Sequence, residues 1–213
     1  CALPIYALFE SILLEAVPDV VHVNHLIDLS PRFINLAHRF GAAVVLSLHD
    51  YYFACPRIIL KKPDGSLCRG PRGGRECADT CFADEGASAH LRWGLRTAYF
   101  RRLLAEPDQV VCPSEYLGEF FERHVPEACI EVIPNGIAFD RPSLTPPQSW
   151  DRNERDRLRI AYLGSIVPHK GIHNVLEAIR IAGISSTHLR VLGHLGDAGY
   201  ARKLRAQAAE VRG

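Results

Sequence analysis

Apolar residues along the first fifty positions alternate between helical spacing and short continuous runs. A helical stripe comes first, and it consists of Ile5, Leu8, Phe9, Ile12, Leu13 and Ala16. The next run, "DVVHVN" (19–24), is β-branched and almost wholly apolar, which predicts a buried strand. Helical spacing returns over 33–40 and ends at Gly41, and "AVVLSLH" then predicts a second strand that ends at His49.

The same alternation resumes after a long interruption. From 51 to 85 the periodicity gives way to Pro, Gly, Arg and Cys, a stretch too long for an ordinary connection. A helix is predicted over 88–105, and the strands "QVVC" (109–112) and "IEVI" (130–133) flank a helix with Leu117, Phe120, Phe121 and His124 on one face. Strands that alternate with helices in this way predict a parallel α/β sheet.

A second α/β unit is predicted beyond residues 141–157. That stretch, "RPSLTPPQSWDRNERDR", is rich in proline and charge and reads as a linker. After it come a strand ("LRIAYLG", 158–164), a helix over 172–179, a strand ("LRVLG", 189–193) and a last helix over 200–211. We therefore predict two Rossmann-like, doubly wound α/β domains, both incomplete in this chain. The N-terminal domain is expected to cover 1–140 and to contain a Cys-rich insertion at 51–85. Residues 158–213 are expected to form the start of the C-terminal domain.

The composition argues against a nucleic-acid-binding protein, a signal peptide and a membrane-spanning segment. The 25 Lys and Arg residues nearly cancel the 24 Asp and Glu residues, so nucleic acid, which needs a surplus of basic groups, is not the expected partner. The apolar opening run has no basic region and contains Glu10 and Glu15, unlike a signal peptide, and no window is long enough to span a membrane. We expect a cytoplasmic protein. The absence of methionine from all 213 residues indicates a piece of a longer protein.

The stretch "YLGSIVPHKGIHNVLEAI" (162–179) has the outline of a phosphate-binding turn. Gly164 and Lys170 match the first glycine and the lysine of a G-x-x-x-x-G-K-[ST] loop. His169 and Gly171 replace the second glycine and the hydroxyl that would hold Mg²⁺, which argues against a metal-dependent ATPase or kinase. A cation beside a helix N-terminus can still bind a diphosphate without metal. The plain alternative is a tight turn at Gly164 and a solvated Lys170.

Five motifs occur in an order that suggests a family. They are "PDVVHVNH", "VVLSLHDYYFACPR", "VVCPSEYL", "VIPNGI" and "YLGSIVPHKGIHNVLEAI". In order and spacing they resemble the family 4 glycosyltransferases of GT-B fold, which are retaining enzymes that move a sugar from a nucleotide-sugar donor to an acceptor. The resemblance runs from about Asp19 to Gly199. It implies no obligatory metal cofactor, and it implies a nucleotide-sugar donor and a glycan or lipid-linked acceptor, as in polysaccharide biosynthesis.

The resemblance also implies roles for individual residues. Two are catalytic: Lys170, which grips the donor diphosphate, and His49, which lies near the donor sugar. The expected donor-binding set is Gly164, Ser165, Lys170, Gly171, Ser114, Asn135 and Gly136. Ser165 stands where relatives usually have an arginine. From the residues alone, Ser114 is equally a helix N-cap and "PNG" a plain turn.

Two further residues belong to the expected acceptor side. His25 follows the first strand and is expected to face the cleft, whereas Asp50 either orients the neighbouring His49 imidazole or faces solvent. The carboxyl ends of parallel strands are where ligands bind in open α/β sheets, which places both residues at the expected edge.

The Cys-rich insertion has few apolar residues with which to hold itself folded. Cys55, Cys68, Cys77 and Cys81 are its candidate metal ligands, and the spacing between the last two is a permissible chelate. Structural zinc, free thiols and disulfides all remain open. The other cysteines, Cys1, Cys112 and Cys129, are predicted to be small buried hydrophobic residues.

Two alternatives accompany the transferase interpretation. The helix "HLRWGLRTAYFRRLLAE" (90–106) mixes arginines with aromatic and aliphatic residues, so it is either a solvated core helix or a peripheral contact with an anionic membrane. The whole chain, in turn, could be a non-catalytic, Cys-stabilised α/β binding module with the same fold. Binding of a nucleotide sugar would distinguish the two functions.

Overall fold

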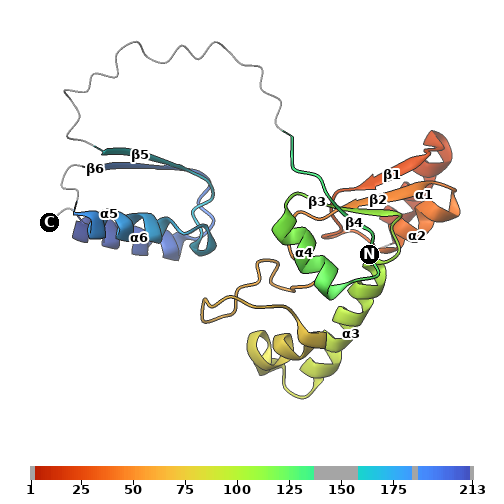
Figure 1. Ribbon diagram of the computed structural model, residues 1–213, viewed down its shortest axis with the longest axis horizontal. Coiled ribbons are helices and arrows are strands. Elements are labelled where there is room, and N and C mark those ends of the chain that lie inside the picture. Colours follow the sequence, from red (N-terminus) through yellow and green to blue (C-terminus); the bar gives the residue numbers. More distant parts are fainter. Residues whose placement is uncertain (1–2, 137–157, 184–186, 212–213) are drawn as a thin grey trace, which may run out of the picture. The chain divides into compact units, whose positions relative to one another are not determined.

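The computed structural model describes residues 3–136, 158–183 and 187–211. It divides the chain into two compact units, residues 1–138 and 139–213 (Figure 1). The predicted linker, 141–157, lies outside the described residues, as does Cys1.

The first unit is built on a four-stranded parallel sheet. Its strands are β1 (Val20–Val23), β2 (Ala43–Ser47), β3 (Gln109–Cys112) and β4 (Ile130–Val132), and they lie side by side in chain order (Figure 1). Val23 is paired with Leu46, Ser47 with Val111 and Cys112 with Val132. Because every neighbouring pair is parallel, the carboxyl ends of all four strands lie along one edge of the sheet.

Four helices accompany this sheet: α1 (Leu3–Ala16), α2 (Arg32–Arg39), α3 (Ser88–Leu104) and α4 (Glu115–His124). The strands supply Val44, Leu46 and Val110 to the core, each fully buried, and the helices cover them with residues such as Ile34 and Phe121. Phe121 lies on the helical face that the sequence periodicity predicts, and Val44, Leu46 and Val110 lie in the predicted strands, whereas Ile34 lies outside the predicted face of its helix. The core therefore holds the sheet rigid behind its carboxyl edge.

Residues 51–85 form an irregular segment, called the Cys segment below. It contains a Lys61–Leu67 bridge and three short turns of helix, η1 (Arg72–Gly74), η2 (Cys77–Cys81) and η3 (Ala83–Glu85). The segment packs on α3 at Gly74, where a Cβ atom would collide with the backbone of Trp93 and Gly94. Glycine is thus required at position 74 by a close backbone approach as well as by its φ of 92°.

The second unit contains a parallel pair of strands, β5 (Leu158–Leu163) and β6 (Thr187–Leu192), paired along their whole length. The helices α5 (Ile172–Ala182) and α6 (Ala198–Val211) lie on the same face of this pair (Figure 1). Ile172 and Leu176 of α5 form a small core with Tyr200 and Leu204 of α6. The prediction of two α/β units with parallel sheets is thereby confirmed.

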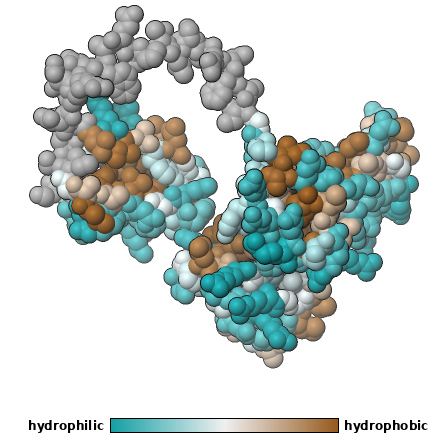
Figure 2. Space-filling model, viewed as in Figure 1, coloured by the Kyte–Doolittle hydropathy of each residue, from teal (hydrophilic) through white to brown (hydrophobic). Residues whose placement is uncertain are grey.

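Large apolar side chains remain at the surface of both units (Figure 2). Examples are Leu8 and Leu14 on α1, Leu91 and Leu95 on α3, and Leu163 at the end of β5. Within the described ranges, the search for a helix long and apolar enough to cross a bilayer finds none.

Candidate functional site

The carboxyl edge of the first sheet collects the site residues predicted for that unit. The residues that follow the four strands are His25 after β1, His49 and Asp50 after β2, Ser114 after β3, and Asn135 and Gly136 after β4. These six residues, which are scattered through the sequence, therefore lie along the same edge of the sheet. Such an edge is the usual ligand site of an open α/β sheet.

His25 and Asp50 are hydrogen-bonded to each other at this edge. His25 Nδ1 accepts a hydrogen bond from the Ile27 amide at 2.9 Å, so the ring hydrogen of the neutral tautomer lies on Nε2. His25 Nε2 in turn donates to Asp50 Oδ2 at 3.2 Å, and Asp50 Oδ1 accepts from the Tyr52 amide at 2.8 Å. Both oxygens of the Asp50 carboxylate are thereby fixed in place.

This geometry corrects the role considered for Asp50. The carboxylate orients the imidazole of His25, which lies 25 positions away, and not that of its neighbour His49. The register of β1 on β2 explains the pairing, because Val23 lies opposite Leu46 and so the residues just beyond the two strands meet.

His49 is the first residue beyond the ladder of β2 and β3. The Leu48 amide still donates to Val111 O at 2.8 Å, so the backbone is held in place up to the residue before His49. The His49 side chain is exposed and has no hydrogen-bond or ion-pair partner within the described part of the chain. His22, by contrast, is bound to Ser47 Oγ at 2.8 Å, between β1 and β2. Of these two imidazoles, only that of His49 is unengaged and open to solvent.

Ser114 caps α4. Its backbone is extended (φ −152°, ψ 150°) and its Oγ accepts from the Leu117 amide at 3.4 Å, as expected of an N-cap residue. The capping alternative that the sequence left open is therefore observed. Asn135 and Gly136, beyond β4, are exposed. A role in donor binding stays a prediction for all three residues.

In the second unit, two glycines close the end of the β5–β6 ladder. Gly164 and Gly193 follow the paired residues Leu163 and Leu192, with φ of 153° and 156°. A Cβ atom on Gly193 would lie far inside contact distance of the carbonyl of Gly164. The Gly164 amide donates to Leu192 O at 2.9 Å, and the Ile166 amide to His194 O at 2.8 Å. The first part of the predicted phosphate turn is therefore built on the end of β6.

Lys170 lies at the entrance to α5. It ends the short turn η5 (Pro168–Lys170), and Gly171 then adopts a left-handed conformation (φ 73°) as the N-cap of α5. The Lys170 side chain is exposed and has no partner among the described residues. The turn thus presents an unpaired ammonium group beside the positive end of a helix dipole.

Tyr200 fixes the start of α5, a contact that the helical spacing of the apolar residues did not indicate. Its hydroxyl oxygen accepts from the His173 amide at 3.1 Å, and the hydroxyl lies 2.7 Å from His173 Nδ1, to which it donates. The Asn174 amide is also engaged, with Gly171 O at 2.9 Å. Two amides at the helix start are therefore occupied and not free to bind a ligand, whereas the charge of Lys170 beside them is unpaired within the described residues.

The family is established by a comparison with known protein families. The model of Glycosyltransferase Family 4 matches residues 2–141, more than half of the chain. The chain belongs to this family. This confirms the resemblance inferred from the five motifs.

Individual proteins resemble the family 4 chain over parts of their length. A lipopolysaccharide 1,2-N-acetylglucosaminetransferase of Salmonella typhimurium is 26% identical over 108 residues, which is 46% of this chain and 26% of that protein. The crystal structure of an α,α-trehalose 6-phosphate synthase from Burkholderia multivorans superposes with a TM-score of 0.50 at 13% identity, over 97% of this chain and 48% of that one. The chain thus spans about a quarter of the first protein and about half of the second. The structural likeness supports a GT-B-like fold.

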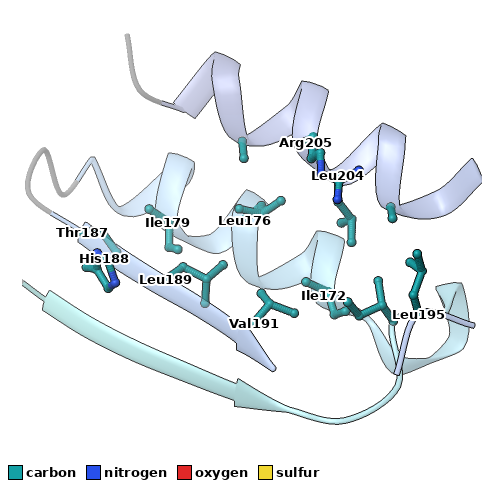
Figure 3. Close-up of a pocket in the computed structure, with 13 residues that line it drawn as sticks. Ile172, Leu176, Ile179, Thr187, His188, Leu189, Val191, Leu195, Leu204 and Arg205 are labelled. Carbon is teal, nitrogen blue, oxygen red and sulfur yellow. The ribbon is translucent and has the colours of Figure 1, made fainter. Parts of the chain in front are cut away.

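The second unit of the family 4 chain also encloses a cavity of about 560 Å³ between β6, α5 and α6 (Figure 3). Leu176, Ile179, Leu189 and Val191 line it, and Arg205 is among its few polar neighbours. Most of its lining is apolar, so placing a diphosphate there would remove water from charged groups at a cost in free energy. Diphosphate binding at the turn of Lys170 stays a prediction.

The cysteines of the family 4 chain fall into two groups. Cys55, Cys68, Cys77 and Cys81 surround a small cavity in the Cys segment, and all four are free thiols. As they stand, no three His, Cys, Asp or Glu side chains in the described part of the chain are grouped closely enough to hold an ion. Cys112 is buried as predicted, whereas Cys129 is exposed, so the prediction for Cys129 was wrong.

Proposed function

We propose that this family 4 chain is the acceptor domain and the first part of the donor domain of a retaining glycosyltransferase. The enzyme would transfer a sugar from a nucleoside-diphosphate sugar to a glycan or a lipid-linked acceptor. The observation that supports this most is the unpaired Lys170 at the entrance to α5, directly after a parallel strand. It is the chemistry needed to hold a diphosphate, in a chain that belongs to a sugar-transferring family.

Lys170 would act on the leaving group. Negative charge grows on the diphosphate as its bond to the sugar breaks, and a preorganised cation stabilises that charge without any reorganisation at the moment of reaction. A charge-assisted hydrogen bond from the ammonium group is worth about 1.5–3 kcal/mol, and the helix dipole adds about 0.3–1 kcal/mol. Gly164, Ser165 and Gly171 would let the diphosphate approach the turn closely, and no obligatory metal enters this scheme.

The edge of the first sheet would serve the sugar and the acceptor. His49, exposed and without an intramolecular partner, is available to contact the donor sugar. Asp50 is part-buried and fixed by His25 and by the Tyr52 amide, and each carboxylate oxygen keeps further lone pairs. A fixed carboxylate of this kind can accept a hydrogen bond from an acceptor hydroxyl. We assign Asp50 to acceptor binding and His25 to its orientation.

The exposed side chains of α3 support the proposal that the acceptor is held at a membrane. Leu91, Leu95 and Tyr99 are 67%, 62% and 49% exposed, and their spacing places them along one side of the helix. The exposed Arg92 and Arg102 flank this stripe. Apolar side chains next to basic ones suit the interface of an anionic bilayer. We therefore propose a cytoplasmic enzyme that contacts the membrane peripherally through α3.

The test of the transferase role is Lys170→Ala in the complete gene product. Transfer from a panel of nucleotide sugars should fall at least about tenfold in kcat, since the lost contact acts mainly on the transition state. Lys203→Ala, which removes another exposed lysine of the second unit, is the matched control and should retain full activity. Unchanged kcat at saturating donor would remove Lys170 from the mechanism.

Calorimetry with the same nucleotide sugars separates the enzyme from the binding-module alternative. Saturable binding that weakens in the Lys170→Ala variant supports the transferase. If no nucleotide sugar in the panel binds the wild-type protein, the chain is a module that keeps the family 4 fold without its chemistry.

A further inference from the structure

The Cys segment brings four thiols to one small cavity, and three of them come from two separate hydrophobic clusters. Cys55 and Cys68 belong to the main core of the first unit, whereas Cys77 belongs to a satellite cluster with Ala78, Ala89 and Trp93. All four cysteines line the same cavity, which has a volume of only about 10 Å³. A space of that size holds about one water molecule or one ion.

All four thiols border the same small cavity, and none of them is in a disulfide. Burial, and then the proximity of the Cys55, Cys68 and Cys81 thiols, raise the pKa of Cys77 to about 12. The pKa of Cys81 is raised as well, first by burial and then also by Cys55 and Cys68.

A backbone amide and several cations lie near the thiols. The Gly70 amide donates to Cys68 Sγ at 3.4 Å, and Cys68 Sγ in turn donates to Gly70 O at 3.5 Å. The positive charges of Arg57 and Lys62 favour the thiolate of Cys81, and that of Arg96 favours the thiolate of Cys77. Lys62 is already paired with Glu76. Arg57 and Arg96 have no ion pair with a carboxylate in the described part of the chain.

Arg96 is the clearest sign that a negative group belongs here. Its Nη2 donates to Tyr52 O, and its guanidinium lies 4.5 Å from the centre of the Phe100 ring. Its Nη1 is buried and has no hydrogen-bond partner. Burial lowers the pKa of this guanidinium, so its present surroundings disfavour the charge. A buried cation without a counter-charge is costly unless the site gains one.

We propose that Cys55, Cys68, Cys77 and Cys81 bind one structural zinc ion. Binding replaces the four S–H bonds with four Zn–S bonds in a tetrahedron and releases four protons, and no oxidant or reductant takes part. The resulting centre has a net charge of about −2, which Arg57 and Arg96 would offset. Four thiolates leave no open coordination position, so the ion is structural. In the present conformation the thiols are not yet close enough to hold an ion, so binding must draw them together around the cavity.

The ion would fasten the satellite cluster to the main core. The satellite has four buried residues, too few to keep the segment folded by burial alone, whereas a structural zinc site stabilises its fold directly. This inference does not depend on the transferase activity, and its test does not measure activity.

The first experiment is elemental analysis of the chain produced in zinc-supplemented medium and purified without a chelator. The expected result is about one zinc per chain, with an X-ray absorption spectrum that shows a sulfur-only shell near 2.3 Å. Cys81→Ser should reduce bound zinc to about a tenth or less. Cys129→Ser is the matched control, because Cys129 is exposed and outside the cluster, and it should bind zinc as the wild type does.

A second measurement covers the case in which Cys81→Ser fails to fold. Trypsin has sites throughout the Cys segment, at Arg57, Lys61, Arg69, Arg72 and Arg75. In the wild-type chain, dipicolinate should open these sites to cleavage, and added Zn²⁺ should close them again. Less than about a tenth of an equivalent of zinc in the wild type, wild-type zinc content in Cys81→Ser, or disulfides among the four cysteines by non-reducing mass spectrometry would each overturn the proposal.

Discussion

Replacing Gly193 by alanine tests how the phosphate turn is built. Gly193 ends β6 at a φ of 156°, and its position against the carbonyl of Gly164 leaves no room for a Cβ atom. To accept one, the ends of β5 and β6 must separate by about 1 Å, since non-bonded heavy atoms do not approach much below 3 Å. That separation breaks the bonds from Gly164 N to Leu192 O and from Ile166 N to His194 O.

The expected cost follows from these two contributions. Each lost hydrogen bond costs about 0.5–1.5 kcal/mol, and the unfavourable backbone conformation costs a non-glycine residue about 1–2 kcal/mol more. Gly193→Ala should therefore destabilise the second unit by about 2–5 kcal/mol. Gly183→Ala is the matched control, because Gly183 also has a positive φ (61°) but nothing lies within 4 Å of an added Cβ, so it should cost only about 1–2 kcal/mol.

Native-state hydrogen exchange, followed by mass spectrometry, measures the opening free energy of β5 and β6 in each variant. Since Gly164 moves with the strand ends, the affinity for the donor should fall in Gly193→Ala and not in Gly183→Ala. If the two variants lose the same stability within about 0.5 kcal/mol, the close approach of the strand ends has no energetic weight and the reasoning fails.

Two further predictions concern other residues of the described structure. Tyr200→Phe should destabilise the start of α5 by about 1–3 kcal/mol, because the His173 amide and Nδ1 lose their partner. Tyr162→Phe is the control and should not destabilise it, because the Tyr162 hydroxyl has no hydrogen-bond partner in the described part of the chain. The hydrogen-exchange rates of the first α5 amides measure the difference. The double variant Leu91→Glu/Leu95→Glu should lose at least about fivefold in co-sedimentation with phosphatidylglycerol vesicles, with the exposed Leu8→Glu of α1 as control. Equal binding by the double variant and the wild type would exclude α3 as the membrane contact.

The helices and strands could be predicted because each has a clear period. The apolar face of α4 is an example, since Leu117, Phe120 and Phe121 are the residues that the structure buries. A tight turn at Gly164 was also one of the two interpretations of the sequence, and the backbone there has a φ of 153°, which favours glycine. These are local properties, and the order of the five motifs added the family.

The pairings between distant residues could not be predicted. The contact of His25 with Asp50 depends on the register of two strands, and that of Tyr200 with His173 on the packing of α6 against α5. Tyr200 was assigned to an apolar helix face, which is correct for its ring and says nothing about its hydroxyl. The exposure of Cys129 and the lack of a hydrogen-bond partner for Arg96 Nη1 in the described part of the chain likewise depend on the folded structure.

The contact between Gly74 and Gly94 bears on how this domain can change over evolution. The Cys segment touches α3 there through backbone atoms, so the contact requires glycine at position 74, whereas a Cβ atom on Gly94 would meet only Gly73 O at an ordinary 3.6 Å. Side chains that lie away from this contact and from the stack of Phe82 on Trp93 can then diverge with less effect on the attachment of the segment to the helix. A lineage can change such positions of the segment and leave the sheet and its carboxyl edge as they are.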